Sequence, residues 1–118
     1  MAANGYPKHH RLLDAADYQA VLRKSTLKVS CRYFLILAID NDLPVSRLGL
    51  VVSKRNVAGA VQRNRIKRQI RECFRHHAPG HGLDMVVLVR KGADGLANGD
   101  IAGKLEQLLV DLAGKCES

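Results

Sequence analysis

Residues 61–77 read VQRNRIKRQIRECFRHH, and an amphipathic helix is the simplest structure for them. At about 100° per residue, four positions share one stripe: Ile66, Ile70, Cys73 and His77. Four others lie nearly opposite: Asn64, Arg68, Arg71 and Arg75. Arg63 and Lys67 flank this polar stripe on one side, and Arg65 flanks it on the other. We therefore predict that one face docks into a core while the other presents a row of guanidinium groups, with Arg65 and Arg68 both pointing to solvent.

The charge of this helix indicates a polyanionic partner. Its six Arg or Lys residues stand against one Glu, so it carries +5 of the chain's net charge of +8. A solvated charged helix would need acidic partners three or four residues away, and only Glu72 is available. Guanidinium groups match phosphate oxygens bidentately and also stack on bases. A membrane-surface helix is disfavoured because the core needs its apolar face.

Outward from this helix, hydrophobic periodicity and turn residues predict the remaining elements. Gly59 precedes helix 60–77, and Pro79-Gly80 ends it. Before it we expect helix 14–24, capped by Asp14 with Asp17 as capping-box partner, then strand 27–40, which could be two strands with a tight turn near Ser30. A turn at 41–46 and a strand at 47–53 follow. After helix 60–77 we expect a central strand 84–90, a loop at 91–99 and a last helix that Asp100 caps and Gly114 ends. This order, helix–strands–helix–strand–helix, predicts an α+β sandwich of one sheet with packed helices. We expect a single domain over 1–118, with a loose arm at 1–10.

Composition disfavours several classes of protein. No apolar run is long enough to span a bilayer, and residues 1–11 lack the apolar region of a secretory signal, so we expect a cytoplasmic protein. The three cysteines are in no C-x-x-C pair, which suits reduced thiols. His76, His77 and His81 near Cys73 suggest zinc, but their spacing matches no closed site, and we expect no metal bound by the protein. The sequence contains no P-loop, no nucleophile elbow and no carboxylate pair, so we predict no catalytic residue in this chain.

The setting of the basic helix favours RNA over DNA. A helix that reads the major groove of DNA needs a helix-turn-helix context, whereas this one lies between predicted strands. A row of cations that contacts backbone and shape suits an irregularly folded RNA. From the residues alone, we therefore predict a small protein that binds structured RNA.

The stretch RLGLVVSKRNVAGAVQRNRIKRQIRECFR, residues 47–75, resembles the bacterial ribonuclease P protein subunit family. That family's signature is a strand ending in V-S-K-[KR], followed by A-V-x-R-N-R-x-K-R-x-x-R-E. Every element is present here: Val52, Ser53, Lys54, Arg55, Ala60, Val61, Arg63, Asn64, Arg65, Lys67, Arg68, Arg71 and Glu72. Upstream, RLLDAADYQAVLRKS resembles the family's R-L-x-x-x-x-D-F-x-x-V-F-x-x-G, and downstream residues 84–91 resemble its apolar strand. The resemblance covers about residues 11–112.

The resemblance implies a subunit of an endoribonuclease that partners a catalytic RNA. Together they would remove the 5′ leader of precursor tRNA by Mg²⁺-dependent hydrolysis, with the active site in the RNA. No protein partner follows from the resemblance, and the residues themselves predict no membrane partner. It also implies a left-handed strand–helix–strand crossover, as in a ribosomal protein domain. The implied RNA-binding residues are Lys54, Arg55, Arg63, Asn64, Arg65, Lys67, Arg68, Arg71 and Arg75. The implied leader cleft, between the sheet and its flanking helices, holds Arg11, Tyr18, Phe34, Arg90 and Lys91.

Two departures from the family pattern bear on the cleft. Leu22 and Leu37 stand where the family often carries aromatic residues, although Tyr18 keeps the ring at the D-F position. Because aromatic rings stack on unpaired bases, more of the grip on the leader should fall to the cations at Arg11, Lys54, Arg90 and Lys91. Phe34 fits a core role as well as an RNA role.

Two other functions compete with this prediction. A structural binder of ribosomal RNA could share the fold and the basic helix, but it would lack the specific run R-N-R-x-K-R-x-x-R-E after V-S-K-R. An independent protein nuclease would need its own cluster of metal-binding carboxylates, and the sequence shows none.

Overall fold

One mixed four-stranded sheet organises the protein. The computed structural model describes residues 15–77 and 82–117. Along the chain its elements are α1 (Ala15–Lys24), β1 (Leu27–Ser30), β2 (Phe34–Asp40), β3 (Arg47–Val51), α2 (Ala60–His77), β4 (Leu83–Val89), the short 3-10 helix η2 (Ala93–Gly95) and α3 (Asn98–Glu117). The strand order is β1-β2-β4-β3, in which β3 pairs with β4 in parallel and the other pairs are antiparallel.

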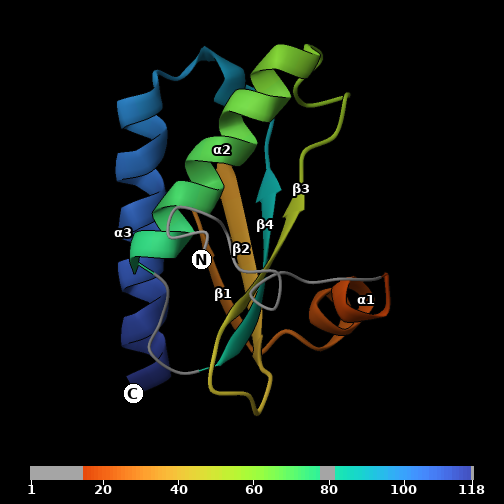
Figure 1. Ribbon diagram of the computed structural model, residues 1–118, viewed down its shortest axis with the longest axis vertical. Helices are drawn as coiled ribbons and strands as arrows, with labels where there is room; N and C mark the ends of the chain where they lie inside the picture. Colours follow the sequence, from red (N-terminus) through yellow and green to blue (C-terminus); the bar gives the residue numbers. More distant parts are fainter. Residues whose placement is uncertain (1–14, 78–81, 118) are drawn as a thin grey trace, which may run out of the picture.

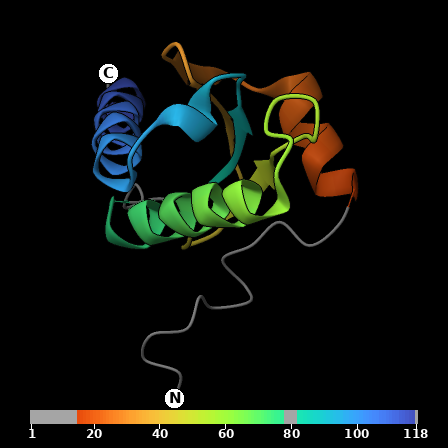
Figure 2. The same cartoon turned by 90° about the horizontal axis from the view of Figure 1, so that it is seen from above.

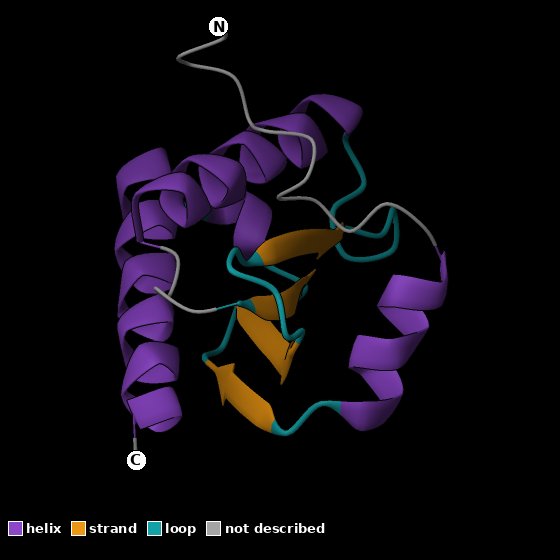
Figure 3. Ribbon diagram, turned by 60° about the horizontal axis from the view of Figure 1, so that its bottom comes forward, coloured by secondary structure: helices purple, strands orange, loops and turns teal. Residues whose placement is uncertain are grey.

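The helices cover the two faces of the sheet unequally. Helices α2 and α3 lie side by side on one face, and α1 lies on the other (Figures 1 and 2). Figure 3 shows the strands enclosed between these two helical layers. The predicted α+β sandwich and its order of elements are therefore confirmed.

The connection from β3 through α2 to β4 is left-handed. In Figure 1 both strands point upward, α2 lies in front of them, and the chain steps from β3 on the right to β4 on its left. Figure 2, seen from above, places α2 on the same side of the sheet. About 98% of such crossovers have the opposite hand, so hydrophobic patterning by itself would predict the wrong topology here, whereas the family resemblance predicts the right one.

Strand alternation divides the apolar residues between two clusters. In β2, Phe34, Ile36 and Ala38 are buried on the α2/α3 side, while Leu37 and Ile39 belong to the smaller cluster beneath α1. The central strand β4 is buried at nearly every position, as expected for a strand covered on both faces. The sheet therefore has a large core on one side and a shallower apolar face on the other.

Several predicted boundaries are confirmed and others are wrong. The helix over 60–77 is confirmed, and strand 27–40 is indeed two strands with a turn after Ser30. Asp100 does not cap the last helix, because α3 begins at Asn98 and the carbonyl of Ala97 accepts the N–H of Asp100 at 3.0 Å. Gly114 does not end α3, which continues to Glu117. The predicted arm at 1–10 and the capping residue Asp14 lie outside the described residues.

The core stripe of α2 also differs from its prediction. Phe74 is 3% exposed and joins the buried residues Ile66, Ile70 and Cys73, whereas His77 is exposed. The reason is that α3 packs beside α2 and widens the buried face toward Phe74. His77, at the end of α2, instead has its Nε2 atom 3.9 Å from a carboxylate oxygen of Glu106 on α3.

Candidate RNA-binding surface

The outer face of α2 presents a row of cations. Arg68, Arg71 and Arg75 are exposed together with Asn64, and Lys67 is half-buried beside them. The opposite face anchors the helix because its four buried side chains pack on the sheet and on α3. The rigid helix therefore holds the cations at fixed spacing along one line, as the sequence predicts.

Acidic neighbours neutralise little of this charge. Glu72 is the acidic residue of α2, and it accepts a hydrogen bond from Arg75 Nη2 and lies 3.3 Å from His76 Nε2. The bond from Arg75 is the main reason that the pKa of Glu72 lies below its ordinary value. Within residues 15–77 and 82–117, Arg68 and Arg71 take part in no ion pair. These two guanidinium groups are the part of the row best placed to receive phosphate oxygens.

Arg63 and Arg65 behave differently from the rest of the row. Arg63 Nη1 donates to the carbonyl oxygens of Val57 at 3.0 Å and Ala58 at 2.8 Å, in the loop before α2. Arg65 Nη1 donates to Asn98 Oδ1 at 2.7 Å, at the start of α3. The prediction that Arg65 points to solvent is therefore wrong, because acceptors distant in sequence draw its side chain inward.

The loop between β3 and α2 places two further cations beside the helix. Val57 is fully buried, and Asn56 Nδ2 donates to the carbonyl of Val89 at 2.9 Å. These contacts hold the loop against the end of β4 and leave Lys54 and Arg55 exposed. Because β3 and β4 are parallel, this loop and the exposed pair Arg90 and Lys91 follow the carboxyl ends of neighbouring strands and therefore lie at the same end of the sheet.

The predicted leader-cleft tyrosine, Tyr18, lies on α1 and packs on the face of the sheet beneath that helix. Tyr18 is half-buried, and its hydroxyl accepts the N–H of Leu50 at 3.0 Å and lies 3.4 Å from the carbonyl oxygen of the same residue. Its ring packs on the cluster of Val21 and Val86. Other half-buried aliphatic residues complete this face: Leu37, Ile39, Val51 and Leu88. The surface is apolar, and Leu22, one of the two residues that depart from the family pattern, is exposed beside it on α1.

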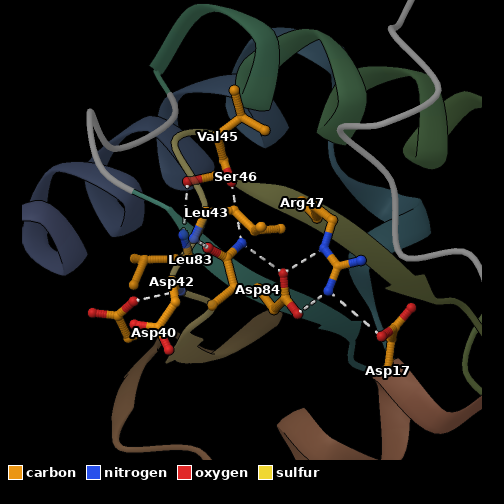
Figure 4. Close-up of polar contacts among 10 residues, drawn as sticks. Asp17, Asp40, Asp42, Leu43, Val45, Ser46, Arg47, Leu83 and Asp84 are labelled. Atoms are coloured by element: carbon orange, nitrogen blue, oxygen red, sulfur yellow. Dashed lines mark hydrogen bonds and ion pairs between the residues drawn. The ribbon is translucent and has the colours of Figure 1, made fainter.

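A polar network connects α1 to the sheet near the start of β3 and β4, at the end of the strands away from Lys54 and Arg90 (Figure 4). Asp84, only 5% exposed, accepts two hydrogen bonds from Arg47, at 2.8 Å from Nε and 2.6 Å from Nη2. Asn41 Nδ2 donates to the same carboxylate at 2.8 Å. Arg47 Nη2 also lies 3.5 Å from Asp17 on α1. The guanidinium group of Arg47 thus connects α1 to β4 and helps to set the position of Tyr18.

Phe34, another of the predicted cleft residues, is not available on this face. Phe34 is fully buried in the larger cluster on the α2/α3 side, so its assignment to the leader cleft is wrong and the core role is the right one. Strand alternation decides this, because Phe34 has the same parity as Ile36 and Ala38. Arg11 lies outside the described residues. Arg90 is exposed and donates from Nη1 to the carbonyl of Cys31 at 3.0 Å.

Sequence reasoning missed an aromatic residue surrounded by cations. Arg32 Cζ and Lys104 Nζ each lie 5.6 Å from the centre of the Tyr33 ring. Gly92, with φ of 97°, packs against this ring, and a Cβ atom there would lie 3.3 Å from Tyr33 Cε1. Arg32 directly precedes Tyr33, but Lys104 comes from α3, far along the sequence, so no local pattern could have indicated the whole cluster.

The described residues give little support for metal binding, a reactive cysteine or a membrane span. No group of three His, Cys, Asp or Glu residues in this part of the chain could hold a metal ion. Burial raises the pKa of Cys73 to about 11, with a smaller contribution from Glu106, so its thiol is protonated at neutral pH. None of the described helices has the length and apolarity needed to cross a membrane.

A basic helix presented by an α+β sandwich with a left-handed crossover defines a class of small proteins that bind polyanions. Comparisons with known proteins specify the class further. The family model described as Ribonuclease P matches residues 6–113. The chain belongs to the family of bacterial ribonuclease P protein components. It is thus a subunit of ribonuclease P, an endoribonuclease that processes tRNA.

Relatives and solved structures agree over most of the chain. The ribonuclease P protein component of Marinobacter nauticus is 51% identical and the alignment covers 92% of this chain and 82% of the relative. That of Pseudomonas aeruginosa is 43% identical, with 100% and 90% covered. The ribonuclease P protein of Staphylococcus aureus matches with a TM-score of 0.78, 34% identity, and 86% and 94% covered. That of Thermotoga maritima matches with a TM-score of 0.74, 30% identity, and 84% and 94% covered.

Proposed function

We propose that the outer face of α2 binds the catalytic RNA of ribonuclease P, and that the face of the sheet beneath α1 binds the single-stranded 5′ leader of precursor tRNA. The observation that carries the first part is the exposed row of Arg68, Arg71 and Arg75, with one acidic residue beside it. Lys54 and Arg55 extend this positive surface beyond the start of α2. A rigid row of cations with a single acidic partner in the described part of the chain, Glu72 beside Arg75, suits a folded RNA backbone.

The leader-binding part rests on the apolar face beneath α1. Tyr18 provides an aromatic ring, and half-buried aliphatic side chains extend the surface on which unpaired bases can lie. The exposed cations Lys54, Arg90 and Lys91, which follow the ends of β3 and β4, can contact the phosphates of the single-stranded leader. The protein thereby lengthens the contact with precursor tRNA, which carries a leader, but adds nothing to the contact with mature tRNA.

The hydrolysis itself is assigned to the RNA. The Mg²⁺ ions that the reaction requires belong to the holoenzyme in this proposal, and the described residues of the chain offer no group that could hold one. The partners are therefore the catalytic RNA and precursor tRNA, in the cytoplasm where tRNA is processed.

The test of the α2 surface is the salt dependence of binding to the catalytic RNA. Arg68→Ala should weaken binding by about 1–3 kcal/mol and should reduce the slope of log affinity against log salt by about one. Lys28→Ala, which removes an exposed cation from the edge strand β1, is the matched control and should change neither quantity. Wild-type affinity and slope in Arg68→Ala would remove α2 as the RNA-binding surface.

A cleavage assay separates this function from an independent protein nuclease. Precursor tRNA is incubated at low salt with the protein, with the catalytic RNA, and with both. We expect the protein to stimulate cleavage only when the RNA is present. Cleavage of precursor tRNA by the protein alone would overturn the assignment of the active site to the RNA.

A further inference from the structure

The two arginines of the R-N-R run each contact a loop beside the start of α2. Arg63 is held by the carbonyl oxygens of Val57 and Ala58, six and five residues before it. These carbonyls belong to the loop that carries Lys54 and Arg55. Asn64, the residue between the two arginines, is exposed and faces outward.

Arg65 reaches the loop on the other side. Its Nη1 donates to the carbonyl of Leu96 at 3.0 Å and to Asn98 Oδ1 at 2.7 Å. Its Nη2 donates to the carbonyl of Asp94 at 3.1 Å, and its Nε donates to Gln62 Oε1 at 2.8 Å. A guanidinium group has five N–H donors in a fixed fork, so these four bonds leave one for any external partner.

From these contacts we propose that Arg63 and Arg65 are positioning residues, not phosphate ligands. Together they brace the loop at 53–59 and the loop at 91–97 against the first turns of α2. The first loop carries the exposed cations Lys54 and Arg55, and the second begins at the exposed pair Arg90 and Lys91. The brace fixes the spacing between these pairs and the exposed arginines of α2, so that the protein meets RNA with its positive surface already formed. This inference rests on the proposed function only for its RNA readout.

Geometry distinguishes the bracing arginines from the binding arginines of the same helix. Arg65 is half-buried and satisfied by acceptors 29, 31 and 33 residues ahead in the sequence, while Arg68 is exposed and takes part in no ion pair within the described residues. To contact a phosphate with its full fork, Arg65 would have to give up the backbone carbonyls of the loop, which would then lose their partner. Pre-forming a binding surface lowers the ordering cost of association without adding a contact.

The test compares Arg65→Met with Arg68→Met, two variants that remove the same group from the same helix. Both should weaken binding to the catalytic RNA, Arg65→Met by about tenfold through a less ordered surface. The slope of log affinity against log salt should stay at its wild-type value in Arg65→Met and fall by about one in Arg68→Met. A fall of about one in both variants would overturn the proposal and make Arg65 a phosphate ligand.

Asn98→Ala removes an acceptor of Arg65 at the start of α3 and leaves α2 itself unchanged. It should weaken RNA binding less than Arg65→Met does, again with an unchanged slope, and the double variant should bind as Arg65→Met does, because both changes remove the same bond. Fully additive losses in the double variant would refute the coupling. This variant also keeps the test decisive should Arg65→Met fold poorly.

Amide hydrogen exchange of the free protein tests the brace without RNA. Arg65→Met and Asn98→Ala should both speed exchange at residues 94–98, and Arg68→Met should leave these amides unchanged. If the loop exchanges at the wild-type rate in both brace variants, the proposal fails even when α2 binds RNA as expected. If the exchange results hold but the Arg68→Met slope is unchanged, the brace stands and the proposed RNA surface fails.

Discussion

Substitution of Tyr18 by phenylalanine should separate the stability of α1 from its role in binding the leader. The hydroxyl of Tyr18 accepts the N–H of Leu50, and its own proton can be donated to the carbonyl of that residue. Leu50 lies on β3, which pairs with β4 alone within the described strands, so these backbone groups lie on an edge of the sheet. Phenylalanine would remove both bonds and keep the ring on the apolar cluster of Val21 and Val86.

The expected loss follows from the two hydrogen bonds. A typical intramolecular hydrogen bond contributes about 0.5–1.5 kcal/mol net to stability, and the bond of 3.4 Å should contribute less than the one of 3.0 Å. Tyr18→Phe should therefore cost about 1–2 kcal/mol in the free energy of unfolding. For a chain of 118 residues, this corresponds to a fall in Tm of about 4–8 °C. Urea denaturation and a melting curve measure both quantities.

The functional half of the prediction compares Tyr18→Phe with Tyr18→Leu in the assembled enzyme. The phenylalanine variant retains a ring and should keep the wild-type ratio of affinities for precursor and mature tRNA. The leucine variant loses the stacking surface and should weaken binding of precursor tRNA alone, by about 1–2 kcal/mol. An unchanged Tm in Tyr18→Phe would refute the stabilising role of the hydroxyl. Equal losses for precursor and mature tRNA in Tyr18→Leu would end the leader-binding role of the ring.

Three further predictions test the interior of the protein. Asp84→Asn should lower the free energy of unfolding by about 2–4 kcal/mol, measured in urea, because it weakens the charged hydrogen bonds from Arg47; a loss below about 0.5 kcal/mol would show that the network in Figure 4 adds little. Phe34→Ala should cost about 3–5 kcal/mol in stability and, at a temperature where it is folded, should leave the ratio of precursor to mature tRNA affinity unchanged; a selective loss of precursor binding would place its ring at the leader after all. Burial raises the pKa of Cys73 to about 11, so its thiolate should form, and its reaction with a thiol reagent should accelerate, only as the pH rises toward that value; rapid labelling of Cys73 at pH 8 in the folded state, located by mass spectrometry, would contradict this.

Local patterns predicted the elements well wherever neighbouring residues carry the information. The helix over 60–77 follows from apolar residues at helical spacing between Gly59 and Pro79, and β4 follows from its continuous apolar run. The end of α3 was predicted less well. Gly114 has the residue type of a helix terminus, yet the helix continues to Glu117. A glycine permits an end without requiring one.

The sequence by itself determined that this chain is a basic α+β protein with one cationic helix, and that it belongs with the ribonuclease P proteins, because periodicity, charge and a long motif are all written in neighbouring residues. Only the tertiary structure decided which arginines of that helix face outward. Arg65 turns inward because its acceptors lie about 30 residues ahead, in the loop before α3 and at the first residue of α3. Tyr18 holds the edge of β3 for the same physical reason: a side chain's partners are set by the packing of distant segments, which no local pattern contains.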